Sequence, residues 1–145
     1  PNNLFVAGFM GSPQMNFINA KVVKRMDDIF LEFGKASIRL PEWKAKKLEG
    51  TEYIGKEVIM GIRPENLHDE EAYISSMPGS VVEGKVEVVE MMGAEVFLYL
   101  VVEGINVIAR VNPRTTAKRG DVIKLAMDAN KIHLFDKDTE RTIIN

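Results

Sequence analysis

The sequence predicts a mainly β fold, a small barrel of short antiparallel strands with one or two short helices. Apolar residues alternate with polar ones in many short runs, and glycine-containing turns separate most of these runs. Within this β-rich part, residues 41–48 have the Lys- and Ala-rich composition of a helix. Strands at such close spacing favour an OB-type barrel over a fold of alternating strands and helices.

The composition excludes several classes of protein. The 145 residues suffice for one ordinary domain, and 46% hydrophobic with 28% charged residues is typical of a folded chain. The net charge of −2, with Lys and Arg scattered among Asp and Glu, argues against a nucleic-acid-binding face. The absence of cysteine excludes disulfides and thiolate metal sites and fits a reducing cytosol. No run approaches the roughly 20 apolar residues of a membrane span, so we expect the chain to stay outside the bilayer.

In the first half we expect two short helices and four strands. Residues 1–10 are predicted to be helical, because proline is tolerated in a first turn and Gly11-Ser12-Pro13 would end the helix. The second helix, 41–48, begins at Pro41 and ends before Gly50. The expected strands are 17–23, 29–33, 36–40 and 57–63.

The second half contains the clearest strand pattern. Three strands form a meander that turns at Gly93 and at Glu103-Gly104. Before this meander, the acidic stretch from Pro64 to Pro78 is expected to be a short turn and a mobile loop. The expected strands are 81–91, 95–101, 105–111, 122–127 and 132–135.

Residues 50–57 nearly match the phosphate-binding loop pattern of nucleotide-binding proteins. That pattern requires Ser or Thr at its last position to bind Mg²⁺, with a strand before the loop and a helix after it. Here Glu57 occupies the last position, a Lys-rich helix precedes the segment and a strand follows it. We therefore interpret this segment as a surface turn.

The two histidines do not define a metal or catalytic site. His68 stands beside Asp69 and Glu70, but adjacent residues of an extended chain point in opposite directions, so we expect a solvated run of charges. His133 falls in a short apolar strand, where a structural imidazole is expected. A hydrolase that uses two carboxylates stays an open alternative, although nothing in the sequence selects a pair.

The aromatic residues are expected in the core rather than in a groove for nucleic acid. Most of them alternate with polar residues at strand spacing, which is typical of core packing. Trp43 differs, because it stands among charged residues of the helix 41–48, where it either contacts a partner or pins the helix to the barrel. The core candidates are Phe30, Phe33, Phe97, Tyr99 and Phe135.

Three stretches carry a family resemblance. The first contains Gly11, Ser12, Pro13, Asn16 and Phe17; the second is Gly61-Ile62-Arg63-Pro64-Glu65; the third runs from Gly84 to Gly93. Residues 133–136 add a match near the end. Together they resemble the C-terminal part of the ATP-binding subunits of carbohydrate ABC importers of the maltose, multiple-sugar and glycerol-phosphate type.

The resemblance implies an OB-like, all-β regulatory domain, called a TOBE domain, over residues 14–145. Residues 1–13 would be the end of the nucleotide-binding domain and the joint. In that family ATP and Mg²⁺ are bound by the nucleotide-binding domain, so we expect no cofactor and no enzymatic activity in this chain. The location would be cytoplasmic, at the membrane surface through the transporter complex.

The resemblance also implies the partners. These are a second copy of the ATP-binding subunit, the membrane subunits through the nucleotide-binding domain, and a regulatory protein, whereas nucleic acid is not expected. We expect the dimer contact near Met91, Met92 and Phe97, with Trp43 as a further candidate contact. The alternative function is an OB-like module that binds a small oxyanion or an oligonucleotide, which would require clustered basic side chains and N–H donors.

Overall fold

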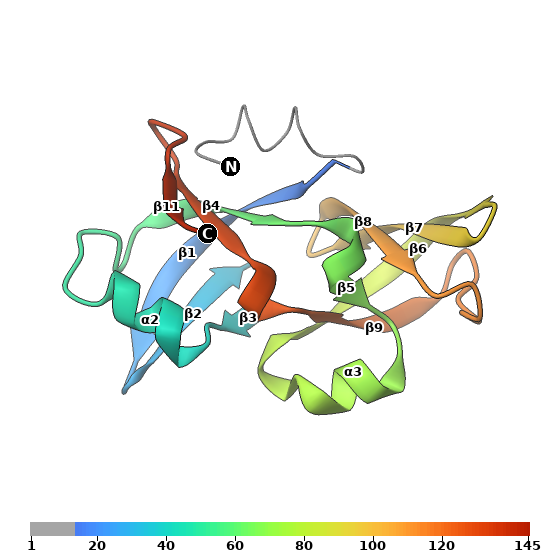
Figure 1. The fold of residues 1–145 in the computed structure, drawn as a ribbon, viewed down its shortest axis with the longest axis horizontal. Coiled ribbons are helices and arrows are strands. Elements are labelled where there is room, and N and C mark those ends of the chain that lie inside the picture. Colours follow the sequence, from blue (N-terminus) through green and yellow to red (C-terminus); the bar gives the residue numbers. More distant parts are fainter. Residues whose placement is uncertain (1–13) are drawn as a thin grey trace.

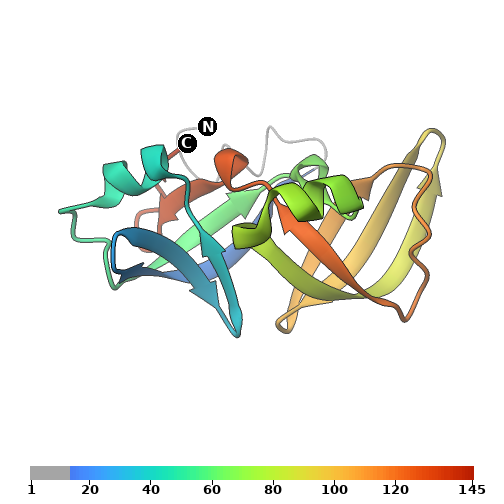
Figure 2. The same ribbon diagram turned by 90° about the horizontal axis from the view of Figure 1, so that it is seen from below.

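The computed structural model describes residues 14–145, which form two curled antiparallel sheets side by side (Figure 1). The first sheet has the strand order β11-β10-β4-β1-β2-β3, and the second has the order β5-β9-β6-β7-β8. Figure 2 shows the first sheet on the left and the second on the right. The predicted class, a mainly β, OB-like fold with short helices, is confirmed.

The first sheet is assembled around the long strand β1. This strand pairs on one side with β2, which pairs with β3, and on the other side with β4, which pairs with β10. Buried positions alternate along β1 and β2, as the two-residue period of a strand requires. The strands of this sheet are β1 (Asn16–Arg25), β2 (Asp28–Phe33), β3 (Ala36–Arg39), β4 (Glu57–Ile62), β10 (His133–Asp136) and β11 (Thr142–Ile144).

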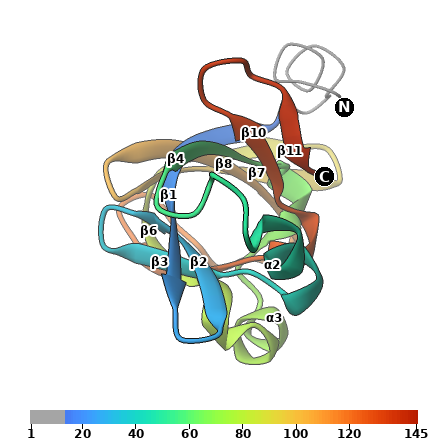
Figure 3. The ribbon, with the colours of Figure 1, turned by 90° about the vertical axis from the view of Figure 1, so that its left-hand side faces the viewer.

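The second sheet is the predicted meander with two further strands. β6, β7 and β8 pair in chain order, and β9 pairs with the free side of β6. β5 pairs with β9 and also contacts β8, so the sheet curls toward closure. Figure 3 views the molecule from the end that carries the first sheet, with the second sheet behind it. Its strands are β5 (Leu67–His68), β6 (Val81–Met92), β7 (Glu95–Val102), β8 (Ile105–Val111) and β9 (Val122–Met127).

The two α-helices of the described chain are short. α2 (Glu42–Leu48) contacts β2 and lies where the sequence predicts it. α3 (Glu71–Ser76) contacts β9 and falls within the stretch 64–78, so the expectation of a mobile loop there is wrong. Three 3-10 turns complete the connections, η1 (Pro64–Asn66), η2 (Pro78–Ser80) and η3 (Ala129–Lys131).

Buried residues explain why the stretch 64–78 is ordered. Pro64 and Pro78 each begin a 3-10 turn, where the fixed φ of proline is favourable. Leu67, in β5, is fully buried and attaches the stretch to the core. β11 was also absent from the prediction, and it extends the first sheet by pairing with β10. The predicted helix 1–10 lies outside the described residues.

One hydrophobic core joins the two sheets. Ile18 and Leu31 from the first sheet belong to the same buried cluster as Leu98 and Leu125 from the second. The chain passes between the sheets after β4, through η1, and returns after β9, through η3. These crossings and the shared core make residues 14–145 one structural unit, rather than two independent lobes.

Candidate interaction surface

Asn16 fastens the two sheets together at the start of β1. Its side-chain Nδ2 donates a hydrogen bond to the Ile108 carbonyl oxygen at 2.8 Å, and its Oδ1 accepts one from the Ile108 N–H at 2.9 Å. Asn16 is buried, and its carboxamide offers a donor and an acceptor in one plane, which suits a backbone N–H and C=O. This signature residue therefore has a structural role.

Phe17 packs in a second apolar cluster on the outer face of the first sheet, and Gly61 lies beside Met15 and Phe135 of this cluster. The Phe17 ring meets the buried Phe135 ring nearly edge-on, with 6.1 Å between the ring centroids. A Cβ at Gly61 would lie 2.5 Å from Met15 Sδ and 3.0 Å from the Phe135 ring. Glycine is needed at position 61 because these two side chains occupy the space of a Cβ.

Arg63, Pro64 and Glu65 form the crossing between the sheets. Arg63 is the extended residue before η1, and its carbonyl oxygen accepts a hydrogen bond from the Asn66 N–H at 2.9 Å. Pro64 is buried at the first position of this turn. Glu65 is half-buried, and its Oε1 has no hydrogen-bond partner within residues 14–145. These three signature residues form the turn that leads from one sheet to the other, and they do not bring catalytic side chains together.

The remaining signature glycines also meet structural needs. A Cβ at Gly84 in β6 would lie 3.0 Å from Val102 Cγ2 and 3.3 Å from Leu100 Cδ2, so glycine permits close packing there. Gly93 has a φ of 62° in the turn between β6 and β7, a left-handed conformation that glycine adopts without a steric penalty. Gly11, Ser12 and Pro13 lie outside the described residues.

Apolar side chains gather on the outer side of the second sheet, which we call the hairpin face (Val88, Met92, Phe97, Tyr99 and Ile108). Val88 is 50% exposed and Met92 is 53% exposed, whereas the other three are half-buried. The strand register places Tyr99 opposite Val88 on one side and opposite Ile108 on the other. Val88, Tyr99 and Ile108 thus form an apolar row across β6, β7 and β8, whereas Phe97 lies between Glu90 and Arg110 on the same face.

Charged groups alternate with the apolar residues of the hairpin face. The Tyr99 hydroxyl donates a hydrogen bond to Glu90 Oε1 at 3.1 Å, and this bond to a carboxylate raises the pKa of Tyr99. Arg110 forms an ion pair with Glu95 at 3.5 Å. A groove of about 410 Å³ runs between these groups, Gln14 and Pro64. Aromatic residues, Met and Arg, which are enriched at protein interfaces, all occur on this face.

The hairpin face corrects the expectation that all five aromatic candidates lie in the core. Phe33 and Phe135 are buried, as expected. Phe97 and Tyr99 lie on the outer side of β7, where they alternate with the buried Val96, Leu98 and Leu100. Phe30 lies on the outer side of β2, where the Arg25 guanidinium sits 5.0 Å from its ring centroid. Strand alternation identified the two faces but did not decide which one is buried.

Met91 and Trp43 are the other proposed contact residues. Met91 is 69% exposed at the end of the β6–β7 hairpin. Trp43 is 45% exposed on α2, and its Nε1 donates a hydrogen bond to Asn130 Oδ1 at 3.1 Å. Trp43 therefore pins α2 to η3 and at the same time exposes part of its ring.

The segments that resembled catalytic or metal sites have other roles. Residues 49–56 form turns that lead into β4 rather than a helix, so the interpretation as a surface turn is confirmed. His68 stacks on Tyr73 with 3.8 Å between ring centroids, and partial burial lowers the pKa of His68. Burial also lowers the pKa of His133 in β10. Over residues 14–145, no three His, Asp or Glu side chains are grouped so that they could hold a metal ion.

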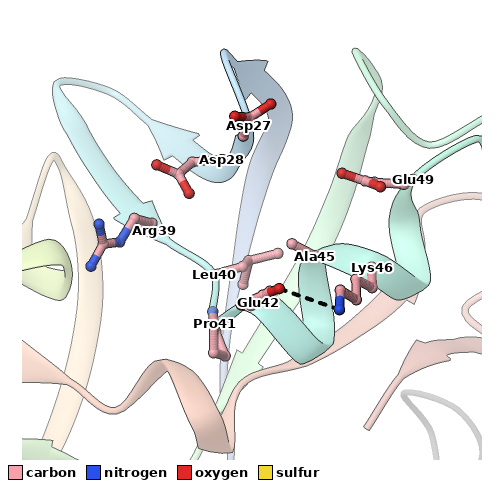
Figure 4. A pocket seen from close by; sticks show the side chains of 9 residues that line it. All are labelled: Asp27, Asp28, Arg39, Leu40, Pro41, Glu42, Ala45, Lys46 and Glu49. Carbon is pink, nitrogen blue, oxygen red and sulfur yellow. Dashed lines mark ion pairs between the residues drawn. The ribbon is translucent and has the colours of Figure 1, made fainter.

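A polar hollow of about 480 Å³ beside α2 is equally unsuited to catalysis (Figure 4). Asp27 borders it from the turn after β1, Asp28 from the start of β2, and Glu49 from the end of α2. Lys46 forms an ion pair with Glu42 at 3.2 Å across one helical turn. The carboxylates are distributed around the rim and do not converge on one point.

The two curled sheets and the structural roles of the signature residues define a class, the OB-like β domains. The profile of the TOBE domain family matches residues 60–135, and the profile of the MalK OB fold domain matches residues 11–67. The chain belongs to the TOBE domain family, in the form that resembles the regulatory domain of sugar-importer ATP-binding subunits. No helix within the described range is long and apolar enough to cross a membrane.

Similar proteins support this assignment. The chain is 42% identical over 140 residues to the oligosaccharides import ATP-binding protein MsmX of Bacillus subtilis, covering 97% of this chain and 37% of that protein. It is 38% identical over 144 residues to the trehalose/maltose import ATP-binding protein MalK of Thermococcus litoralis, covering 99% of this chain and 38% of that protein. The chain thus spans well under half the length of these relatives.

A solved structure shares the fold at low sequence identity. The cytoplasmic molybdate-binding protein ModG superposes with a TM-score of 0.60 at 14% identity, covering 82% of this chain and 94% of that protein. At this identity the likeness concerns the fold alone, and it is consistent with the OB-like architecture.

Proposed function

We propose that this chain is the regulatory and dimerisation domain of the ATP-binding subunit of a sugar-importing ABC transporter. Its membership of the TOBE domain family and its similarity to two import ATP-binding proteins support this role. In this proposal ATP and Mg²⁺ bind to a nucleotide-binding domain in the longer protein, and the chain itself catalyses no reaction.

The exposed apolar side chains of the hairpin face are the observation that carries the dimerisation proposal. A twofold contact buries the same patch on both copies, so the patch must complement itself. The hairpin face meets this requirement, because it combines apolar side chains with both signs of charge. Arg110 of one copy would face Glu90 or Glu95 of the other across the twofold axis.

A permanent contact at this position would serve the transport cycle. Nucleotide-binding domains that open and close need one fixed point about which to move, and two paired β domains would provide it. The membrane subunits would bind through the nucleotide-binding domain, which would hold this chain at the cytoplasmic side of the membrane. A regulatory protein is a further proposed partner.

Light scattering over a wide concentration range tests the proposal. We expect the chain to form a dimer, and Met92→Glu to weaken dimerisation at least about tenfold, because a carboxylate would be buried in an apolar contact. Met26→Glu is the matched control, since Met26 is 93% exposed in the turn between β1 and β2. Strictly monomeric behaviour, both of this chain and of a longer chain that carries the ATP-binding domain, would contradict dimerisation.

A further inference from the structure

α2 presents an aromatic ring that is surrounded by cations. Trp43 is 45% exposed and is the single tryptophan of the sequence. The Nζ atoms of Lys44 and Lys47 lie 5.1 and 5.2 Å from the centre of its ring. Lys47 follows Trp43 by four residues, which places both side chains on the same face of the helix.

The Trp43 ring is held in a fixed position. Its Nε1 donates a hydrogen bond to Asn130 Oδ1 at 3.1 Å, and the neighbouring Lys44 Nζ donates one to the Ile132 carbonyl oxygen. Both acceptors belong to the connection between β9 and β10, so α2 is attached there by two adjacent side chains. A preordered ring loses little conformational entropy when it binds a partner.

Lysines from two elements lie near this ring: Lys44 and Lys47 belong to α2, and Lys131 directly follows Asn130, the hydrogen-bond partner of Trp43, in η3. Burial is the main cause that lowers the pKa of Lys44. The Asp128 carboxylate has the largest effect among the neighbouring charges and raises this pKa, whereas the charges of Lys47 and Lys131 lower it. Within residues 14–145, Lys47 and Lys131 form no ion pair, whereas Lys46 is paired with Glu42.

We propose that Trp43, Lys47 and Lys131, which we call the tryptophan patch, dock an acidic segment of a partner protein. Carboxylates of that segment would pair with the two free lysines, and an apolar or aromatic side chain would cover the exposed part of the Trp43 ring. The patch lies on α2 and η3, and α2 is far from the β6–β7 hairpin (Figure 1), so this inference stands whether or not the hairpin face forms a dimer.

The surrounding charges favour a protein segment over a nucleic acid. A phosphate backbone requires a continuous path of cations. Here Glu42 and Glu49 on and after α2, and Asp128 before η3, interrupt such a path. A short acidic segment needs only the two lysines and the ring.

The single tryptophan allows a direct test on the 145-residue chain. A peptide of sequence EEFEE is titrated while Trp43 fluorescence and the NMR resonance of its indole N–H are followed. We expect a saturable response in at least one readout. The dissociation constant should rise at least tenfold in the double variant Lys47→Glu with Lys131→Glu, and severalfold when both lysines are replaced by Gln. The control pair Lys24→Glu with Lys118→Glu changes two exposed lysines elsewhere and should weaken binding less than twofold.

Several results would overturn the proposal. One is the absence of a saturable response in both readouts up to millimolar peptide. Another is equal weakening by the patch pair and by the control pair, which would show that only net charge matters. Tighter binding of oligothymidylate or of the peptide KKFKK would show that the patch does not select an acidic protein segment. Circular dichroism establishes that each variant is folded.

Discussion

The side-chain amide of Asn16 hydrogen bonds to both backbone groups of Ile108, which lies 92 positions further along the chain. One bond is 2.8 Å long and the other 2.9 Å. Asn16 begins β1 in the first sheet, and Ile108 lies in β8 of the second. This pair therefore holds the two sheets in register where the described part of the chain begins.

Replacing Asn16 should destabilise the domain. Asn16→Leu leaves the Ile108 N–H and carbonyl without their partner, and we expect a loss of about 1–3 kcal/mol in the free energy of unfolding. Urea denaturation measures this loss. Asn106→Leu is the matched control, since Asn106 is exposed in β8, the strand that contains Ile108. It should change stability by less than about 0.5 kcal/mol. Equal effects of the two substitutions would contradict the role assigned to Asn16.

The outer cluster of the first sheet predicts a second result. Gly61→Ala places a methyl group 2.5 Å from Met15 Sδ and 3.0 Å from the Phe135 ring. We expect a loss of about 1–3 kcal/mol, which is typical of overpacking. Shortening Met15 should relieve part of this collision. Gly61→Ala should therefore lower the stability less in a Met15→Ala background than in the wild type. Thermal denaturation of the four proteins checks this, and strict additivity would refute the collision with Met15.

Two glycines with similar backbone angles should respond differently to alanine. Gly34 and Gly50 have φ values of 58° and 74°, so both substitutions introduce backbone strain of about 1 kcal/mol. A Cβ at Gly34 would also lie 2.5 Å from Glu103 Oε1, whereas a Cβ at Gly50 would meet no atom within 4 Å. Gly34→Ala should therefore lower the denaturation midpoint more than Gly50→Ala does. The reverse order would contradict the contact between the β2–β3 and β7–β8 turns.

Lys44 predicts a pH dependence of stability. Burial lowers the pKa of this lysine from its ordinary 10.5 to about 8 in the folded protein. Between these values the unfolded chain binds more protons than the folded chain, so the stability contributed by this group rises with pH. Relative to Lys44→Met, the free energy of unfolding of the wild type should rise by on the order of 3 kcal/mol between a pH below 8 and pH 10.5. Urea denaturation measures this rise. A difference that does not vary with pH would contradict the burial of a charged Lys44.

Most strands could be predicted because their apolar residues alternate and glycine turns separate them. The meander from β6 to β8 is the clearest case, since Gly93 and Gly104 mark its two turns. Secondary structure was missed where tertiary contacts hold short elements in place. β5 and β11 have 2 and 3 residues, and such lengths carry no periodic signal.

The candidate site was less predictable than the fold. β7 is apolar on both faces, so alternation alone did not show that Phe97 and Tyr99 point outward. The role of Gly61 depends partly on Phe135, and that of Asn16 on Ile108, both distant in sequence. The resemblance identified these signature residues, whereas only the structure gives the contacts that require them.

Cross-linking through a single cysteine tests most directly whether the hairpin face joins two copies. The sequence contains no cysteine, so Met92→Cys and Met26→Cys each introduce one exposed thiol. With a short bis-maleimide reagent at a protein concentration where the dimer is populated, we predict rapid formation of a covalent dimer for Met92→Cys and a largely monomeric product for Met26→Cys. Cross-linking of the two variants at the same rate would contradict a dimer that forms through the hairpin face.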